Sequence, residues 1–106
     1  MAIYRVREWD EFRGYLVKFR PREIFYAVEE SPLSRPPIAL RLLFVHGGDT
    51  YIFVDFARGN SLAKTGIPVL NPRGSTPWIS VDALKSLILR DLDDVELVDF
   101  SMTTIL

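Results

Sequence analysis

The strongest constraint on the fold is a pair of apolar segments, residues 39–46 and 51–56, with Gly-Gly-Asp-Thr between them. Both segments are rich in aliphatic and aromatic residues, which favour extended strands. A short glycine-containing connection between two such segments is a strong signal of a β-hairpin. The sequence therefore predicts an antiparallel pair of strands in the middle of the chain, and we expect the other elements to assemble around it.

The two faces of this hairpin can be separated because successive side chains of a strand point to opposite sides of the sheet. With a two-residue or a four-residue loop, one face is the same aliphatic set: Leu43, Val45, Ile52 and Val54. We expect this aliphatic face to receive the helices. The opposite face carries a more aromatic set: Leu40, Leu42, Phe44, His46, Tyr51, Phe53 and Asp55. Its rings would suit a stacking platform for bases, a dimer interface, or burial under a long loop.

Two helices are predicted from apolar residues that recur at three- and four-residue spacing. The first covers residues 9–19 and ends before Pro21, since the residue before a proline disfavours helical geometry. Its apolar face consists of Trp9, Phe12, Leu16 and Phe19. The second covers about residues 81–91 and begins after Ser80, whose side chain is well suited to cap a helix N-terminus.

The remaining strands are expected at residues 3–7, 24–28 and 95–102. The first is short and suits a sheet edge, whereas the second is apolar on both faces and suits a central position. The element order β-α-β-β-β-α-β predicts one α+β domain over residues 1–106. We expect an antiparallel-rich sheet of about four to five strands centred on the hairpin, with two helices on one face.

Composition narrows the class of protein. Apolar residues make up 48% and charged residues 25% of the 106 residues, which is typical of a globular chain. The high apolar share for so short a chain predicts a homodimer. No apolar run reaches the roughly 18 residues that a membrane span needs, and we expect a cytoplasmic protein. Arginine outnumbers lysine ten to three, and glutamine and cysteine are absent, which fits either a thermophilic source or a GC-rich genome.

Residues 56–81 form a stretch of 26 residues without a carboxylate, although acidic residues slightly outnumber basic ones in the whole chain. This acid-free stretch carries Arg58, Lys64 and Arg73, together with the aromatic residues Phe56 and Trp78. Long connections without regular structure are uncommon in small domains and are usually functional or disordered. Two interpretations remain open: an ordered, positively charged surface, or a long crossover whose charge is accidental.

The sequence offers little for catalysis, and we expect a non-enzymatic protein without cofactor or metal. His46 is the one histidine, and no nucleophile is placed beside it to form a catalytic triad. Asp91, Asp93 and Asp94 follow a helix, and their spacing matches no calcium-binding loop. With no cysteine, the chain has neither a disulfide nor a cysteine metal site.

Binding of single-stranded DNA or RNA is the favoured hypothesis, because arginine pairs with phosphate and aromatic rings stack on unpaired bases. The candidate residues are Arg58, Lys64, Arg73, Trp78, Tyr51, Phe53, Arg41 and Arg35. The alternative is a protein-interaction module or assembly subunit, since arginine and aromatic residues also dominate protein interfaces. A homodimer would use either the aromatic hairpin face or the tail, residues 102–106. The first of these would compete with base stacking.

At the level of layout, the chain resembles the ThermoDBP-related proteins of thermophilic archaea. The resemblance rests on a small, cysteine-free, arginine-rich α+β domain with a hairpin-centred sheet and a basic, aromatic-lined side, and it covers roughly residues 24–100. It implies single-stranded nucleic-acid binding in a cleft beside a four-stranded antiparallel sheet. The long C-terminal zipper of the founding members of that family is absent from this chain. The resemblance assigns no individual residue.

Overall fold

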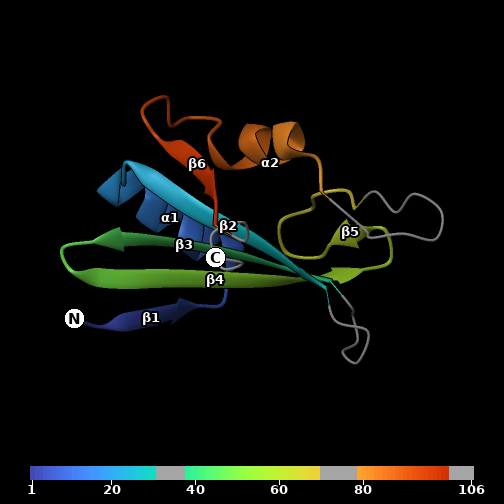
Figure 1. Ribbon diagram of the computed structural model, residues 1–106, viewed down its shortest axis with the longest axis horizontal. Helices are drawn as coiled ribbons and strands as arrows, with labels where there is room; N and C mark the ends of the chain where they lie inside the picture. The colour runs from blue at the N-terminus through green and yellow to red at the C-terminus, as the bar shows by residue number, and fades with distance from the viewer. Residues whose placement is uncertain (31–37, 70–78, 101–106) are drawn as a thin grey trace.

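The computed structural model describes residues 1–30, 38–69 and 79–100, in which a mixed sheet is accompanied by two helices (Figure 1). The elements in chain order are β1 (Ile3–Val6), α1 (Trp9–Phe19), β2 (Glu23–Glu30), β3 (Ile38–His46), β4 (Asp49–Arg58), β5 (Ser61–Leu62), α2 (Val81–Ile88) and β6 (Glu96–Asp99). Among the described residues, neither helix is long and apolar enough to cross a membrane.

The strand order is β1-β4-β3-β2-β6, and the two-residue strand β5 pairs with β4. The three long strands β4, β3 and β2 run antiparallel, whereas β1 and β6 add in parallel at the two edges. The predicted α+β class, with an antiparallel-rich sheet centred on the hairpin, is confirmed. The first strand lies at an edge and β2 lies inside the sheet, as expected.

The hairpin turn consists of two residues, Gly47 and Gly48, because His46 pairs directly with Asp49. Both glycines have positive φ, 59° and 83°, which is the backbone requirement of the turn type that matches the twist of a two-residue hairpin. Glycine adopts these angles without steric cost. The connection therefore fixes the register of β3 against β4, and with it the side of the sheet to which each hairpin residue points.

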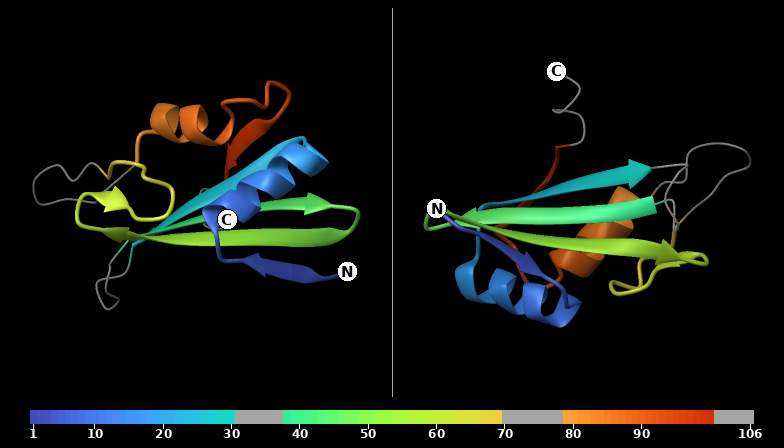
Figure 2. Two further views of the ribbon diagram at one scale, coloured as in Figure 1. Left: turned by 180° about the vertical axis from the view of Figure 1, so that it is seen from behind. Right: turned by 90° about the horizontal axis from the view of Figure 1, so that it is seen from below.

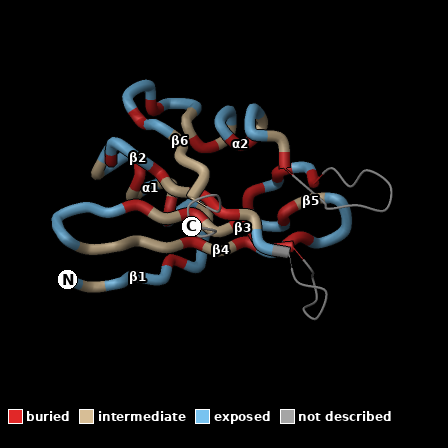
Figure 3. Tube along the Cα trace, in the orientation of Figure 1, coloured by how far each residue is buried: buried red, intermediate tan, exposed pale blue. Residues whose placement is uncertain are grey.

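Both helices lie on the same side of the sheet, as the view from below shows (Figure 2). This side carries the aromatic set of the hairpin. The ring of Phe12 in α1 lies 5.5 Å from the rings of both Phe44 and Phe53, measured between centroids. Leu84 and Ile88 of α2 belong to the same buried core cluster. Along β3 and β4, buried positions alternate with more exposed ones (Figure 3).

The expectation that the aliphatic hairpin face receives the helices is therefore wrong. Leu43, Ile52 and Val54 are only half-buried, and Val45 is 53% exposed. The physical reason is that Arg41 shares its face with Leu43 and Val45, so burying this face would bury a guanidinium. On the other face, large rings on the sheet match the large rings of α1. We call the side of the sheet away from the helices the open face.

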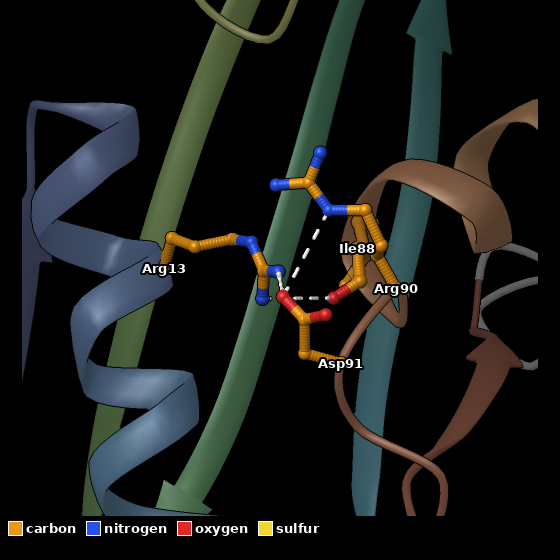
Figure 4. Close-up of polar contacts among 4 residues, drawn as sticks. All are labelled: Arg13, Ile88, Arg90 and Asp91. Atoms are coloured by element: carbon orange, nitrogen blue, oxygen red, sulfur yellow. Dashed lines mark hydrogen bonds and ion pairs between the residues drawn. The ribbon is translucent and has the colours of Figure 1, made fainter.

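The two helices are also joined by a polar contact (Figure 4). Arg13 of α1 donates from Nη2 to Asp91 Oδ2 at 2.9 Å and from Nη1 to the Ile88 carbonyl at 3.4 Å. Asp91 lies just beyond α2, which ends at Ile88, earlier than the sequence predicts. Ser80 caps α2 as expected, accepting the Ala83 amide at 3.4 Å.

Candidate nucleic-acid interface

The open face carries a row of four apolar residues with Arg5 at one end, and this row crosses five strands of the sheet. Each residue of the row is paired with the next in the sheet register, from edge to edge: Arg5, Ile52, Leu43, Phe25 and Val98. The next row contains Val54, Arg41 and Ala27, and the row after it contains Phe56, Ala39 and Glu29. Apolar side chains thus occupy the middle of the open face, and cations stand beside and among them.

A groove of about 640 Å³ lies over this part of the sheet. Its lining residues come from β1, β3, β4, two connecting segments and the residue after β6: Arg5, Val6, Arg7, Arg41, Leu43, Ile52, Val54, Lys64 and Phe100. Four of these nine residues are cations and none is acidic. Such a groove combines an apolar floor with positive charge at its border, which is the chemistry that suits an unpaired, phosphate-linked strand.

Lys64 owes its position to a buried carboxylate. Asp55 of β4 accepts the Lys64 amide at 3.1 Å and 3.0 Å, and it accepts both the amide and the hydroxyl of Thr65, at 2.9 Å and 3.0 Å. These bonds hold the segment after β5 against the sheet. The Lys64 ammonium then donates to the Arg7 carbonyl at 3.0 Å, which places its charge at the β1 end of the groove.

Arg41 is the cation nearest the middle of the sheet, since it pairs with Val54 on one side and Ala27 on the other. Its guanidinium faces Glu29 of the neighbouring strand, with Nη1 at 2.8 Å from Oε1 and Nη2 at 3.3 Å from Oε2. By contrast, the described residues offer no acidic ion-pair partner to Arg5 or Arg7, which are both exposed.

Three of the predicted binding residues lie at or near the groove. Arg41 lines it on the open face, whereas Lys64 lines its edge, with the ammonium 5.6 Å from the centroid of the Phe53 ring on the helix side. Arg58 is exposed at the end of β4, on the same side as Val54 and Phe56 by the alternation of the strand. Predicted residues Arg35, Arg73 and Trp78 lie outside the described residues, as does the tail that was expected as a dimer interface.

The two hairpin aromatics predicted to stack on bases belong instead to the helix side. Phe53 is 0% exposed, so its ring is part of the core. Tyr51 is half-buried and stacks on both neighbours in the sheet, Tyr4 at 5.1 Å and Phe44 at 4.9 Å. Burial, followed by the nearby Asp49 carboxylate, raises the pKa of Tyr51. The Phe53 ring is therefore closed to a base, and the Tyr51 ring is already stacked on Tyr4 and Phe44. The aromatic hairpin face packs against the helices within the described residues.

Sequence reasoning missed Arg5 and Arg7 as groove residues. The signal was present, because residues 3–7 were predicted to be a strand, and alternation places Ile3, Arg5 and Arg7 on one side of it. The sequence does not reveal that this strand pairs with β4, in parallel and at the edge of the sheet. That pairing brings Arg5 beside Ile52 and joins a residue from the start of the chain to the hairpin.

A second, smaller groove of about 350 Å³ lies between the end of α2 and β6. It is lined by Lys85, Leu89, Asp93, Asp94, Val95, Glu96 and Leu97. In the described ranges, no three acidic or histidine side chains gather closely enough to hold a metal ion. Asp93 and Asp94, in the turn before β6, are both exposed.

Comparisons of the chain with protein-family models, with characterised proteins and with solved structures give no match.

Proposed function

We propose that this protein binds single-stranded DNA or RNA, without catalysis and with little sequence preference, on the open face of its sheet. The observation that carries the proposal is the groove, in which four cations border an apolar floor and none of the nine described lining residues is acidic. Phosphates contribute most of the affinity of sequence-independent binding, and arginine is the residue best shaped to contact them.

In this proposal the phosphates contact Arg5, Arg7 and Lys64 at the β1 end of the groove and Arg41 in its middle. The bases lie over the aliphatic floor and against exposed rings. Phe25 and Phe100 meet edge to face at 6.5 Å, and Phe56 is 47% exposed two rows away. A single strand suits this surface better than a duplex does, because its bases are free to contact apolar side chains.

The test is a titration of a labelled oligonucleotide of about 20 bases, repeated at increasing salt from about 50 mM. Arg5→Ala should weaken binding and lower the slope of log affinity against log salt by about 0.7, the value for one phosphate contact of a single strand. Arg90→Ala is the matched control, since Arg90 is an exposed arginine just beyond α2, on the helix side, with only a 3.8 Å contact to Asp91. Equal effects of the two variants, or no binding at about 50 mM salt, would reject the proposal.

The second candidate function is a protein-interaction module, and one observation favours it. The open face exposes apolar residues at both ends of the hairpin, with Val45 53% and Phe56 47% exposed. A second copy of the chain or an acidic partner could cover them. A homodimer formed through this face would also cover the groove. Light scattering with and without the oligonucleotide separates the two functions. If the groove binds nucleic acid, the protein is a monomer with the oligonucleotide bound, because a dimer through this face would cover the groove. If the face is a protein interface, a dimer persists in the presence of the oligonucleotide.

The layout resembles that of the ThermoDBP-related proteins, and this resemblance implies the same function as the first proposal, single-stranded nucleic-acid binding. That function stays a prediction. Under that proposal, the binding surface is the open face of the sheet. The choice between DNA and RNA is made by parallel titrations of oligonucleotides that differ only in the sugar, since the 2′-hydroxyl is the group that lets a protein tell them apart.

A further inference from the structure

The pair formed by Arg41 and Glu29 stands out among the cations of the open face. Glu29 lies on β2 opposite Ala39, two residues along β3 from Arg41, so the two side chains meet diagonally across neighbouring strands. Each guanidinium Nη atom faces a different carboxylate oxygen, at 2.8 Å and 3.3 Å. The guanidinium and the carboxylate thus meet side by side, with a hydrogen bond from Nη2 to Oε2 and an ion pair between Nη1 and Oε1.

The same side-by-side arrangement is the geometry in which arginine binds a phosphate group. Glu29 therefore occupies, within the free protein, the donors that a backbone phosphate would need at the middle of the groove. The other three groove cations are different, because Lys64 is bonded to a carbonyl and no described acidic side chain pairs with Arg5 or Arg7. Among the described residues, the Arg41 position alone has an anion already in place.

We propose that Glu29 competes with the ligand's phosphate for Arg41 and so sets the affinity of the middle of the groove. This inference rests on the proposed function and adds a residue to it that lies outside the groove lining. The protein binds a phosphate at Arg41 only after the carboxylate has turned away, whereas Arg5 and Arg7 are available from the start. The β1 end of the groove then makes the first contact, and the Arg41 position makes a later one.

The size of the effect follows from the exposure of the pair. The side chains of Arg41 and Glu29 are 39% and 48% exposed, and exposed ion pairs contribute little to stability because water and salt screen them. A phosphate can therefore displace the carboxylate, and removing the carboxylate should strengthen binding only about two- to fivefold at low salt. A much larger gain would mean that Glu29 acts through the fold and not through Arg41.

The experiment compares Glu29→Gln with Glu23→Gln in titrations of a labelled oligothymidine of about 20 bases at about 50 mM salt. Glu23 is the matched control, since it is exposed on the same strand and the same side, and it has no ion-pair partner among the described residues. Both changes remove one negative charge. Glu29→Gln should bind about two- to fivefold more tightly than the wild type, and Glu23→Gln should bind clearly less tightly than Glu29→Gln.

The double variant with Arg41→Ala completes the test. If Glu29 acts by occupying Arg41, the advantage of Glu29→Gln over Glu23→Gln disappears once Arg41 is alanine. Equal gains for the two glutamine variants, or an advantage that persists without Arg41, would refute the competition while leaving the proposed function intact. Failure of the wild type and of every variant to bind would overturn the proposed function, and this inference with it. Thermal unfolding of each variant verifies that the fold is retained.

Discussion

The Asp55 side chain is only 1% exposed, and it is surrounded by hydrogen-bond donors from the segment after β5. No described cation pairs with it. Its charge is met by two backbone amides and the hydroxyl of Thr65, an arrangement that satisfies a buried carboxylate through aligned donors. At the residue scale, this group connects the core to the groove, because it holds the backbone of Lys64 in place.

Replacing Asp55 with alanine should lower the free energy of unfolding by about 2–5 kcal/mol, since it removes the acceptor of the buried Thr65 amide and hydroxyl and of the part-buried Lys64 amide. Asp55→Asn keeps one acceptor oxygen and should lose less. Denaturant unfolding of both variants measures the difference. A loss below about 0.5 kcal/mol for Asp55→Ala, the range of ordinary surface changes, would show that the carboxylate has no such role.

At the scale of elements, the sequence was sufficient to predict the features that neighbouring residues determine, such as helices, helix caps and tight turns. The periodicity of α1, the Ser80 cap and the glycine turn of the hairpin all predicted the observed elements, with boundaries shifted by a few residues. The side of the sheet that receives the helices was not predicted correctly. Both faces of the predicted hairpin segments, residues 39–46 and 51–56, are apolar, and within them each face carries one charged residue, Arg41 on one and Asp55 on the other.

These two charges have opposite consequences, and the sequence alone does not distinguish them. Arg41 has a long side chain whose charge stays in water, so it marks a solvent-facing side. Asp55 is short and can be buried when backbone amides turn toward it, which requires the long-range contact with Lys64 and Thr65. That contact depends on tertiary structure. The site prediction failed for the same reason. Because the helices were expected on the aliphatic face, Tyr51 and Phe53 were expected on the side away from the helices, whereas they lie on the helix side.

Paired truncations on the two faces test this assignment. Phe53→Ala should lower the free energy of unfolding by about 3–5 kcal/mol, because it removes a fully buried ring that contacts Phe12 and Trp9. Val45→Ala, on the open face, should change it by no more than about 0.5 kcal/mol. Chemical denaturation measures both. A greater loss for Val45→Ala than for Phe53→Ala would mean that the faces are reversed.

At the scale of the whole molecule, the described residues form two layers, with both helices on one side of the sheet (Figure 2). The groove lies over the other side, where Arg41, Leu43, Ile52 and Val54 line it. Among the described residues, the core lies on the helix side, whereas Leu43, Ile52 and Val54 on the open face are only half-buried. Charge is also divided unevenly along the chain, since residues 1–81 hold eleven basic and eight acidic residues, a net charge of +3. The groove cations all come from residues 5–64, whereas residues 82–106 have a net charge of −4 and include the acidic turn after α2.

The most direct test of the open face as the binding surface is methyl NMR during titration with a single-stranded oligonucleotide at low salt. The methyl signals of Leu43, Ile52 and Val54 should move together and saturate, because these side chains form the floor of the groove. Those of Leu84 and Ile88, buried on the helix side, should stay in place. Shifts centred on Leu84 and Ile88, or none at Leu43, Ile52 and Val54 while the oligonucleotide is bound, would contradict the account.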